Sequence, residues 1–211
     1  MSWYEIPFPM PARFGYRDEP APDEAAIASG NQIHGIRIEQ VAACGRIPDT
    51  DGLITTEAGL TIGIRVADCA AVLLAAPRHG MVAAVHAGWR GAVGGIHLEA
   101  VRRLADLDAN MDDIHAWISP CIGLQAFEVG DEVAGQFPER FVHRLGYGKP
   151  HVDLAGYLSD GLLQAGVPNT QLIVDGRCTV SDPHRFHSYR RDGKEAGRMW
   201  ALITNLSSHH D

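Results

Sequence analysis

The sequence predicts an α+β domain in which mixed β-sheets are layered with helices, and three observations support this fold class. Candidate strands and helices alternate irregularly along the chain, which is typical of α+β domains rather than of doubly wound parallel sheets. Two short apolar runs separated by a turn predict a hairpin, which interrupts any strand–helix–strand repeat. The chain has 211 residues and 45% of them are hydrophobic, so we expect one compact domain over residues 1–211.

The predicted hairpin covers residues 70–85. Its apolar runs, 70–76 and 81–85, are too short for typical helices, and their valines favour buried strands. The four residues between the runs, Pro-Arg-His-Gly, are typical of a turn. Because a hairpin brings the start of its first strand beside the end of its second, we expect Cys69 and His86 at the same end of the sheet.

Ahead of the hairpin, the pattern favours strands and connections. Residues 1–24 are rich in proline, which opposes a helix, so we expect a strand and a loop along the surface. Residues 36–41 alternate apolar and polar side chains as a half-buried strand does, and residues 60–66 form another candidate strand. The polar segment 45–59 between these strands is expected to be a connection.

Beyond the hairpin, residues 92–107 carry apolar side chains at helical spacing, with Gly94 and Gly95 near the start. The unpaired amides at such a helix start would offer an anion site. The remaining pattern predicts a strand at 114–120, a helix beginning near 130–131, a helix at 153–166, a strand at 170–178, a polar turn with a last strand at 186–206, and a frayed tail at 206–211.

Composition and charge exclude several classes of protein. A formal charge of -8 argues against a general nucleic-acid binder, because phosphate backbones favour basic surfaces. No apolar run reaches the roughly 18 residues that a membrane span needs. The N-terminus lacks the pattern of a signal peptide, so we expect a cytoplasmic protein with reduced cysteines. No glycine motif for a dinucleotide or a P-loop is present.

Three residues are candidates for a metal site: His34, Cys69 and His86. Each lies beside a predicted strand end and a glycine-bearing turn, where a side chain can converge on a cleft. Imidazole nitrogens and a thiolate are ligands that zinc prefers, and three protein ligands would leave a fourth position for water or substrate. The residues alone leave a second interpretation open, in which Cys69 is a buried core thiol and the histidines are surface residues.

Five motifs occur in order along the chain: QIHG at 32–35, ADC at 67–69, HAGWRG at 86–91, PCIG with FEVGDEV at 120–133, and SYRRDGKEAGR at 188–198. With these motifs the sequence resembles the YfiH family, also called the laccase-domain or polyphenol oxidase family, over residues 31–205. The resemblance implies a fold of the YfiH/CNF-like type. It also implies a metal site of two histidines and one cysteine, which match His34 in QIHG, Cys69 in ADC and His86 in HAGWRG.

The function that the resemblance implies is a zinc-dependent purine nucleoside enzyme. The family is associated with phosphorolysis of adenosine, inosine, guanosine and methylthioadenosine, and with adenosine deamination, so a purine nucleoside and phosphate are the expected partners. Its older labels are copper-dependent polyphenol oxidase and cysteine hydrolase with a peptidoglycan-editing role. The region before the first histidine, residues 1–30, is shorter than is usual in the family, which makes substrate specificity harder to predict.

Roles follow for residues near the three ligands. A planar guanidinium fork suits phosphate, because it pairs two phosphate oxygens at once. Arg90 is the first candidate, with Arg65 and Arg190 second; a structural ion pair is the alternative for Arg90. Asp68 is expected to orient a ligand histidine or to accept a proton, unless it only caps a turn. Trp89 could stack on a purine or serve packing.

Four functions therefore stay open from the sequence. The first is the zinc nucleoside phosphorylase or deaminase. A copper oxidase is disfavoured, because redox copper chemistry normally uses several clustered His and Met ligands. A cysteine hydrolase would use Cys69 as nucleophile and His86 or His34 as base, which are the same residues that would bind zinc. The fourth is a metal-binding module with weak activity.

Overall fold

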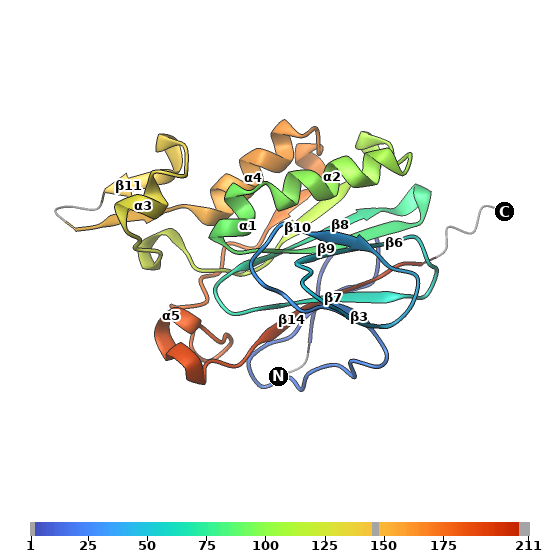
Figure 1. Ribbon diagram of the computed structural model, residues 1–211, viewed down its shortest axis with the longest axis horizontal. Coiled ribbons are helices and arrows are strands. Elements are labelled where there is room, and N and C mark those ends of the chain that lie inside the picture. Colours follow the sequence, from blue (N-terminus) through green and yellow to red (C-terminus); the bar gives the residue numbers. More distant parts are fainter. Residues whose placement is uncertain (1–2, 145–147, 207–211) are drawn as a thin grey trace.

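The structure is a computed structural model that describes residues 3–144 and 148–206. It has three layers: two six-stranded sheets lie face to face, and helices cover the outer face of one of them (Figure 1). Both sheets combine parallel and antiparallel neighbours, so the predicted α+β class with mixed sheets is confirmed.

The first sheet has the order β1-β2-β14-β7-β3-β5, with bounds Tyr4–Glu5, Ala12–Phe14, Met199–Thr204, Thr61–Val66, Ala28–Gly30 and Gly45–Ile47. The second has the order β13-β10-β8-β9-β6-β4, with bounds Leu172–Val174, His115–Ile118, Ala70–Ala76, Met81–Ala87, Gly52–Thr55 and Ile38–Gln40. A small sheet pairs β11 (Val142–Arg144) with β12 (Pro150–Val152). The α-helices are α1 (Trp89–Val93), α2 (Ile96–Asp106), α3 (Asp131–Ala134), α4 (Leu154–Gln164) and α5 (Tyr189–Asp192).

The predicted hairpin is present as β8 and β9, which pair antiparallel along their whole length. Val72 and Leu74 face the core under α2 and α4, whereas Leu73 and Ala75 face the core between the two sheets. A strand that is covered on both faces needs no polar alternation, which explains the continuous apolar runs in this part of the sequence.

Several predicted elements are confirmed with shorter bounds. The strands at 36–41, 60–66, 114–120 and 170–178 are β4, β7, β10 and β13, and β14 is the last strand. The helix at 153–166 is α4, whose start is fixed by Asp153, because its carboxylate accepts a hydrogen bond of 2.9 Å from the amide of Gly156. Apart from Leu206, the tail at 206–211 lies outside the described residues.

The segment 45–59 is not a simple connection, and that prediction was wrong. It contains β5 and β6, and β6 is buried along its length beside β9, with Leu53 opposite Ala84. Some of its polar side chains, those of Thr50, Asp51 and Thr55, are buried with hydrogen-bond partners. Thr55, for example, donates from Oγ1 to the carbonyl of Val41 at 2.8 Å. A buried strand with satisfied polar groups shows neither the period nor the composition on which the prediction relied.

Two further expectations need correction. Residues 92–107 form part of two helices, α1 and α2, because Gly95 has a φ of 81° and interrupts the run. Residues 1–24 do form strands and loops, but β2 lies within a sheet and Phe14 is fully buried, so the segment is not confined to the surface. Among the described residues, none of the helices combines the length and apolar character that crossing a membrane requires.

Candidate functional site

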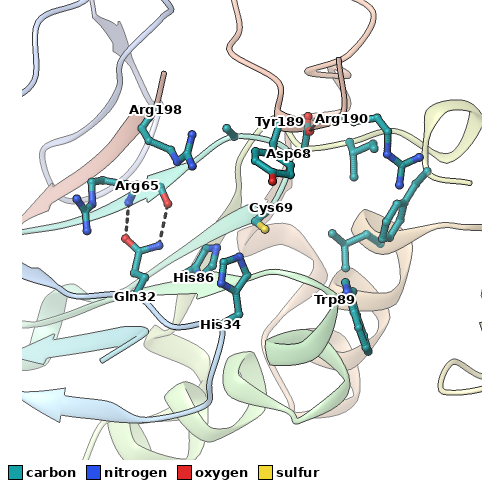
Figure 2. A pocket seen from close by; sticks show the side chains of 14 residues that line it. Gln32, His34, Arg65, Asp68, Cys69, His86, Trp89, Tyr189, Arg190 and Arg198 are labelled. Carbon is teal, nitrogen blue, oxygen red and sulfur yellow. Dashed lines mark hydrogen bonds between the residues drawn. The ribbon is translucent and has the colours of Figure 1, made fainter. Parts of the chain in front are cut away.

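Three side chains meet where β8 begins and β9 ends, at one end of the second sheet (Figure 2). The ring nitrogens of His34 and His86 and the sulfur of Cys69 offer ligand atoms that lie within 4.8 Å of one another. His86 is buried, Cys69 is half-buried and His34 is exposed, so the cluster opens toward solvent on the His34 side. The structure thus brings together the three residues that the sequence predicts as metal ligands.

Each of the three side chains comes from a different segment of the chain. His86 lies in β9 opposite Ala71, and Cys69 immediately precedes β8. His34 lies in the loop after β3, and its φ of 63° puts the backbone in the left-handed region that side chains other than glycine rarely adopt. Such a conformation persists where neighbouring contacts fix it. Here the contacts come from one carboxylate.

That carboxylate belongs to Asp51, which is fully buried just before β6. It accepts hydrogen bonds from the amides of Ile33 at 3.0 Å, His34 at 2.9 Å and Gly35 at 2.8 Å. It also accepts one from Nδ1 of His86 at 2.7 Å. Asp51 therefore fixes the backbone of one candidate ligand and the ring of another. With Nδ1 of His86 donating to Asp51, Nε2 is the nitrogen left for a metal ion.

Asp51 was missed at the sequence level because its partners are distant along the chain and lie across the sheet. Burial would raise the pKa of Asp51, but the bond from His86 and the amides of the His34 loop outweigh it and lower the pKa. Burial likewise would lower the pKa of His86, but Asp51 and Cys69 raise the pKa to about 9.

The pKa of the Cys69 thiol is lowered, whereas that of His86 is raised. Burial would raise its pKa, but hydrogen bonds with His34 and His86 and the charges of these rings lower the pKa to about 6. A thiolate between two imidazoles is a donor set that suits a borderline-soft cation such as zinc. The chemistry of the three side chains and their spacing therefore fit a metal ion with an open fourth position.

Gly88 allows the cluster to be this tight. A Cβ on Gly88 would lie 2.8 Å from the sulfur of Cys69 and 3.3 Å from Cδ2 of His34. The backbone at Gly88 has a φ of -69°, which any residue adopts, so the requirement for glycine is one of space. This close approach explains the glycine that follows His86 and Ala87 in the chain.

Asp68 has a different role from the predicted orientation of a ligand histidine. Its carboxylate accepts bonds from Oγ1 of Thr179 at 2.6 Å, from Oγ of Ser188 at 3.1 Å and from the amide of Arg190 at 2.6 Å. These bonds attach α5 to the segment beside Cys69. The orienting role belongs to Asp51, since Asp51 is the carboxylate bonded to His86.

The cluster lines a cavity of about 610 Å³, a volume typical of small-molecule sites (Figure 2). On one side of the cluster lie Arg65 and Arg198; on the other lie Trp89 and Arg190 (Figure 2). The apolar part of the lining is Ile122, Phe127 and Leu154, which belong to the buried cluster against which Trp89 packs. The cavity therefore has arginines on both sides of the cluster, and an aromatic and apolar wall on the Trp89 side.

The arginines divide into two groups. Arg65 and Arg190 line the cavity, as does Arg198, which the sequence did not single out. Arg90 is not among the described residues that line the cavity. Its side chain is exposed, and its guanidinium lies 4.3 Å from the ring centroid of Trp89. Arg191, which follows Arg190 in the chain, forms an ion pair with Asp192 at 2.7 Å.

Comparisons with known proteins agree with this fold. The family model described as multi-copper polyphenol oxidoreductase laccase matches residues 17–205. A purine nucleoside phosphorylase of Deinococcus radiodurans is 40% identical over 178 residues, covering 82% of this chain and 68% of that protein. Adenosine deaminase RL5, from an unknown prokaryotic organism, is 36% identical over 172 residues, covering 78% of this chain and 64% of that protein.

Solved structures of other proteins share this fold. The crystal structure of YlmD from Geobacillus stearothermophilus has a TM-score of 0.89 and 27% identity, covering 98% of this chain and 97% of that one. The crystal structure of YfiH from Bacillus licheniformis has a TM-score of 0.81 and 29% identity, covering 88% of this chain and 76% of that one. The chain belongs to the multi-copper polyphenol oxidoreductase laccase family, the YfiH family that the sequence motifs indicated.

Proposed function

We propose that this protein is a zinc-dependent purine nucleoside phosphorylase that acts on adenosine, inosine, guanosine or methylthioadenosine. The observation that carries the proposal is the cluster of His34, Cys69 and His86 on the wall of a cavity of about 610 Å³ with an aromatic side. The names of the relatives support the same class of reaction. Adenosine deamination is a second reaction for the same site, supported by the name of one relative.

In the proposed reaction a phosphate oxygen forms a bond to C1′ of the ribose while the bond from C1′ to the purine nitrogen breaks. The electron pair of that bond goes to the purine, which takes up the proton that the phosphate loses. The sugar becomes ribose 1-phosphate, or 5-methylthioribose 1-phosphate when methylthioadenosine is the substrate. When bound by His34, Cys69 and His86, zinc would supply a Lewis acid with one position open to oxygen.

The other contributions come from the chain itself. Asp51 holds the proton on Nδ1 of His86 and so presents Nε2 to the cluster. Trp89 and Phe127 offer apolar rings on which a purine can stack and which exclude water from that side. Asp68 positions the main chain of Arg190, and with it the wall formed by Tyr189 and Arg190.

The test is phosphate-dependent release of base. Zinc-loaded protein is incubated with each of the four nucleosides, with and without phosphate, and the products are separated by chromatography. We expect free purine and the corresponding sugar 1-phosphate only when phosphate is present, and loss of both products after chelation or in Cys69→Ala. Conversion of adenosine to inosine without phosphate would show the deaminase reaction. If neither occurs in zinc-loaded protein, the proposal is wrong.

A cysteine hydrolase is the second candidate, because the lowered pKa of Cys69, about 6, makes it a thiolate at neutral pH in the metal-free protein. The two candidates respond oppositely to chelation. A nucleophilic thiolate needs no metal and should gain activity when zinc is removed, whereas phosphorolysis should stop. A multi-copper oxidase has less support. Residues 3–144 and 148–206 contain one group of three clustered metal-binding side chains, and several copper ions would need more ligands than these.

A further inference from the structure

The side chain of Gln32 lines the cavity, but its amide group is bonded to the protein itself. Its nitrogen donates to the carbonyl of Arg65 at 2.8 Å, and its oxygen accepts from the main-chain amide of Arg65 at 2.9 Å (Figure 2). Two bonds to a single residue fix the plane of the side-chain amide. Gln32 is therefore attached to β7, although its position on the cavity wall would suit a substrate-binding group.

The two bonds replace main-chain pairing that ends shortly before Gln32. β3 pairs with β7 in parallel, with Ser29 opposite Gly63. Gly63 and Arg65 are two residues apart, so their main-chain groups face the same edge of β7. A longer β3 would supply partners for Arg65, but β3 ends at Gly30. The side chain of Gln32 supplies these partners instead, which avoids the cost of unpaired main-chain groups.

Because a side chain completes the pairing, the backbone after β3 can turn toward the metal-ligand cluster. His34 lies two residues after Gln32 and has the left-handed φ of 63°. The carboxylate of Asp51, just before β6 of the second sheet, accepts bonds from three amides of residues 33–35. Gln32 holds the start of the same loop on β7 of the first sheet. The loop that carries His34 is therefore attached to both sheets.

Among the three candidate ligands, His34 depends most on such attachments. Cys69 and His86 are placed by the β8–β9 hairpin, whereas His34 is exposed and lies in a loop. We propose that Gln32 is a positioning residue for the metal centre: by replacing the end of β3 with its side chain, it holds His34 where an ion can be shared with Cys69 and His86. The inference rests on the proposed metal-dependent function and assigns Gln32 no contact with substrate.

Zinc affinity, measured by competition with chelators of graded strength, tests this role without any turnover. Gln32→Met removes both bonds and keeps a side chain of similar length, so zinc affinity should fall about tenfold. Gln171→Met is the matched control. The side-chain nitrogen of Gln171 also donates to a main-chain carbonyl, that of Asp112 at 2.9 Å, and Asp112 pairs with Arg78 in the turn at the other end of the hairpin. Its zinc affinity should stay within about twofold of the parent.

A double-mutant cycle distinguishes positioning of His34 from a general effect on the fold. In His34→Ala the ligand that Gln32 positions is absent, so adding Gln32→Met should change the remaining zinc affinity by less than about twofold. In His86→Ala the His34 ring is still a ligand, and the loss of about tenfold should persist. An equal loss in the parent and His34→Ala backgrounds, or an equal loss in Gln171→Met, would overturn the inference.

The outcomes also separate this inference from the proposed function. If the cycle gives the expected result and no nucleoside is cleaved, Gln32 has the proposed role and the phosphorylase assignment is wrong. If Gln32→Met binds zinc as tightly as the parent and still releases purine in the presence of phosphate, the function stands and the inference is overturned.

Discussion

At the scale of single residues, the feature with the widest effect is the Asp51 carboxylate. It contacts His86 directly and fixes the left-handed backbone of His34 through three amides, so two of the three candidate ligands depend on it. Groups that orient metal ligands in this way usually contribute about 10- to 100-fold to metal affinity. Asp51 is therefore expected to matter almost as much as the ligands.

We predict that Asp51→Asn lowers zinc affinity about 10- to 100-fold, because an amide nitrogen cannot accept the bonds that one of the two oxygens accepts. Competition with a chromophoric chelator measures the affinity. Asp113→Asn is the matched control. Asp113 is also buried and accepts bonds from Nδ1 of His79 and the amide of Arg78, each at 2.9 Å, but it lies near the other end of the β8–β9 hairpin. Equal losses in both variants would show that Asp51 acts on the fold rather than on the metal centre.

Gly88 gives a second prediction at this scale. Gly88→Ala should reduce zinc affinity by at least about tenfold, because its Cβ would lie 2.8 Å from the sulfur of Cys69 and the ligands would have to move apart. Gly176→Ala is the control, since a Cβ there meets nothing within 4 Å. Zinc bound after dialysis, measured by elemental analysis, distinguishes the two. A zinc-saturated Gly88→Ala protein would contradict the described packing of the cluster.

At the scale of elements, the helices α2 and α4 pack around a buried polar ring. His97 of α2 is 1% exposed, and neither ring nitrogen has a hydrogen-bond partner among the described residues. Its ring lies 5.9 Å from that of Tyr157 in α4 and packs against Gly161. Burial lowers the pKa of His97 to about 4, which links the packing of these helices to pH.

The sign of this linkage follows from where the proton binds. Between about pH 6.5 and pH 4 the unfolded chain protonates His97 and the folded protein does not, so stability falls as the pH falls. The depressed pKa corresponds to about 3 kcal/mol across this window. His97→Leu should lose that part of the pH dependence, which urea unfolding of both proteins at pH 7 and pH 4.5 measures. An equal loss of unfolding free energy between pH 7 and pH 4.5 in both proteins would show that His97 is not the group responsible.

At the scale of the whole molecule, prediction succeeded where the signal was local and failed where it was not. The β8–β9 hairpin followed from two short apolar runs and a turn, and the positions of Cys69 and His86 followed from the hairpin. β6 was missed because a polar side chain within it forms its hydrogen bond with a residue that is distant in the sequence. Asp51 was missed for the same reason: it bonds to His34 and His86, which the fold brings near, and no spacing in the sequence indicates it.

The central claim is that His34, Cys69 and His86 bind one zinc ion beside the cavity. Zinc-edge X-ray absorption of the purified protein tests it directly, because sulfur and nitrogen ligands lie at distinguishable distances. We predict one sulfur at about 2.3 Å and two imidazole nitrogens at about 2.0–2.1 Å, with a light atom in the fourth position. A zinc shell made only of nitrogen and oxygen, or a spectrum unchanged in Cys69→Ala, would contradict the claim.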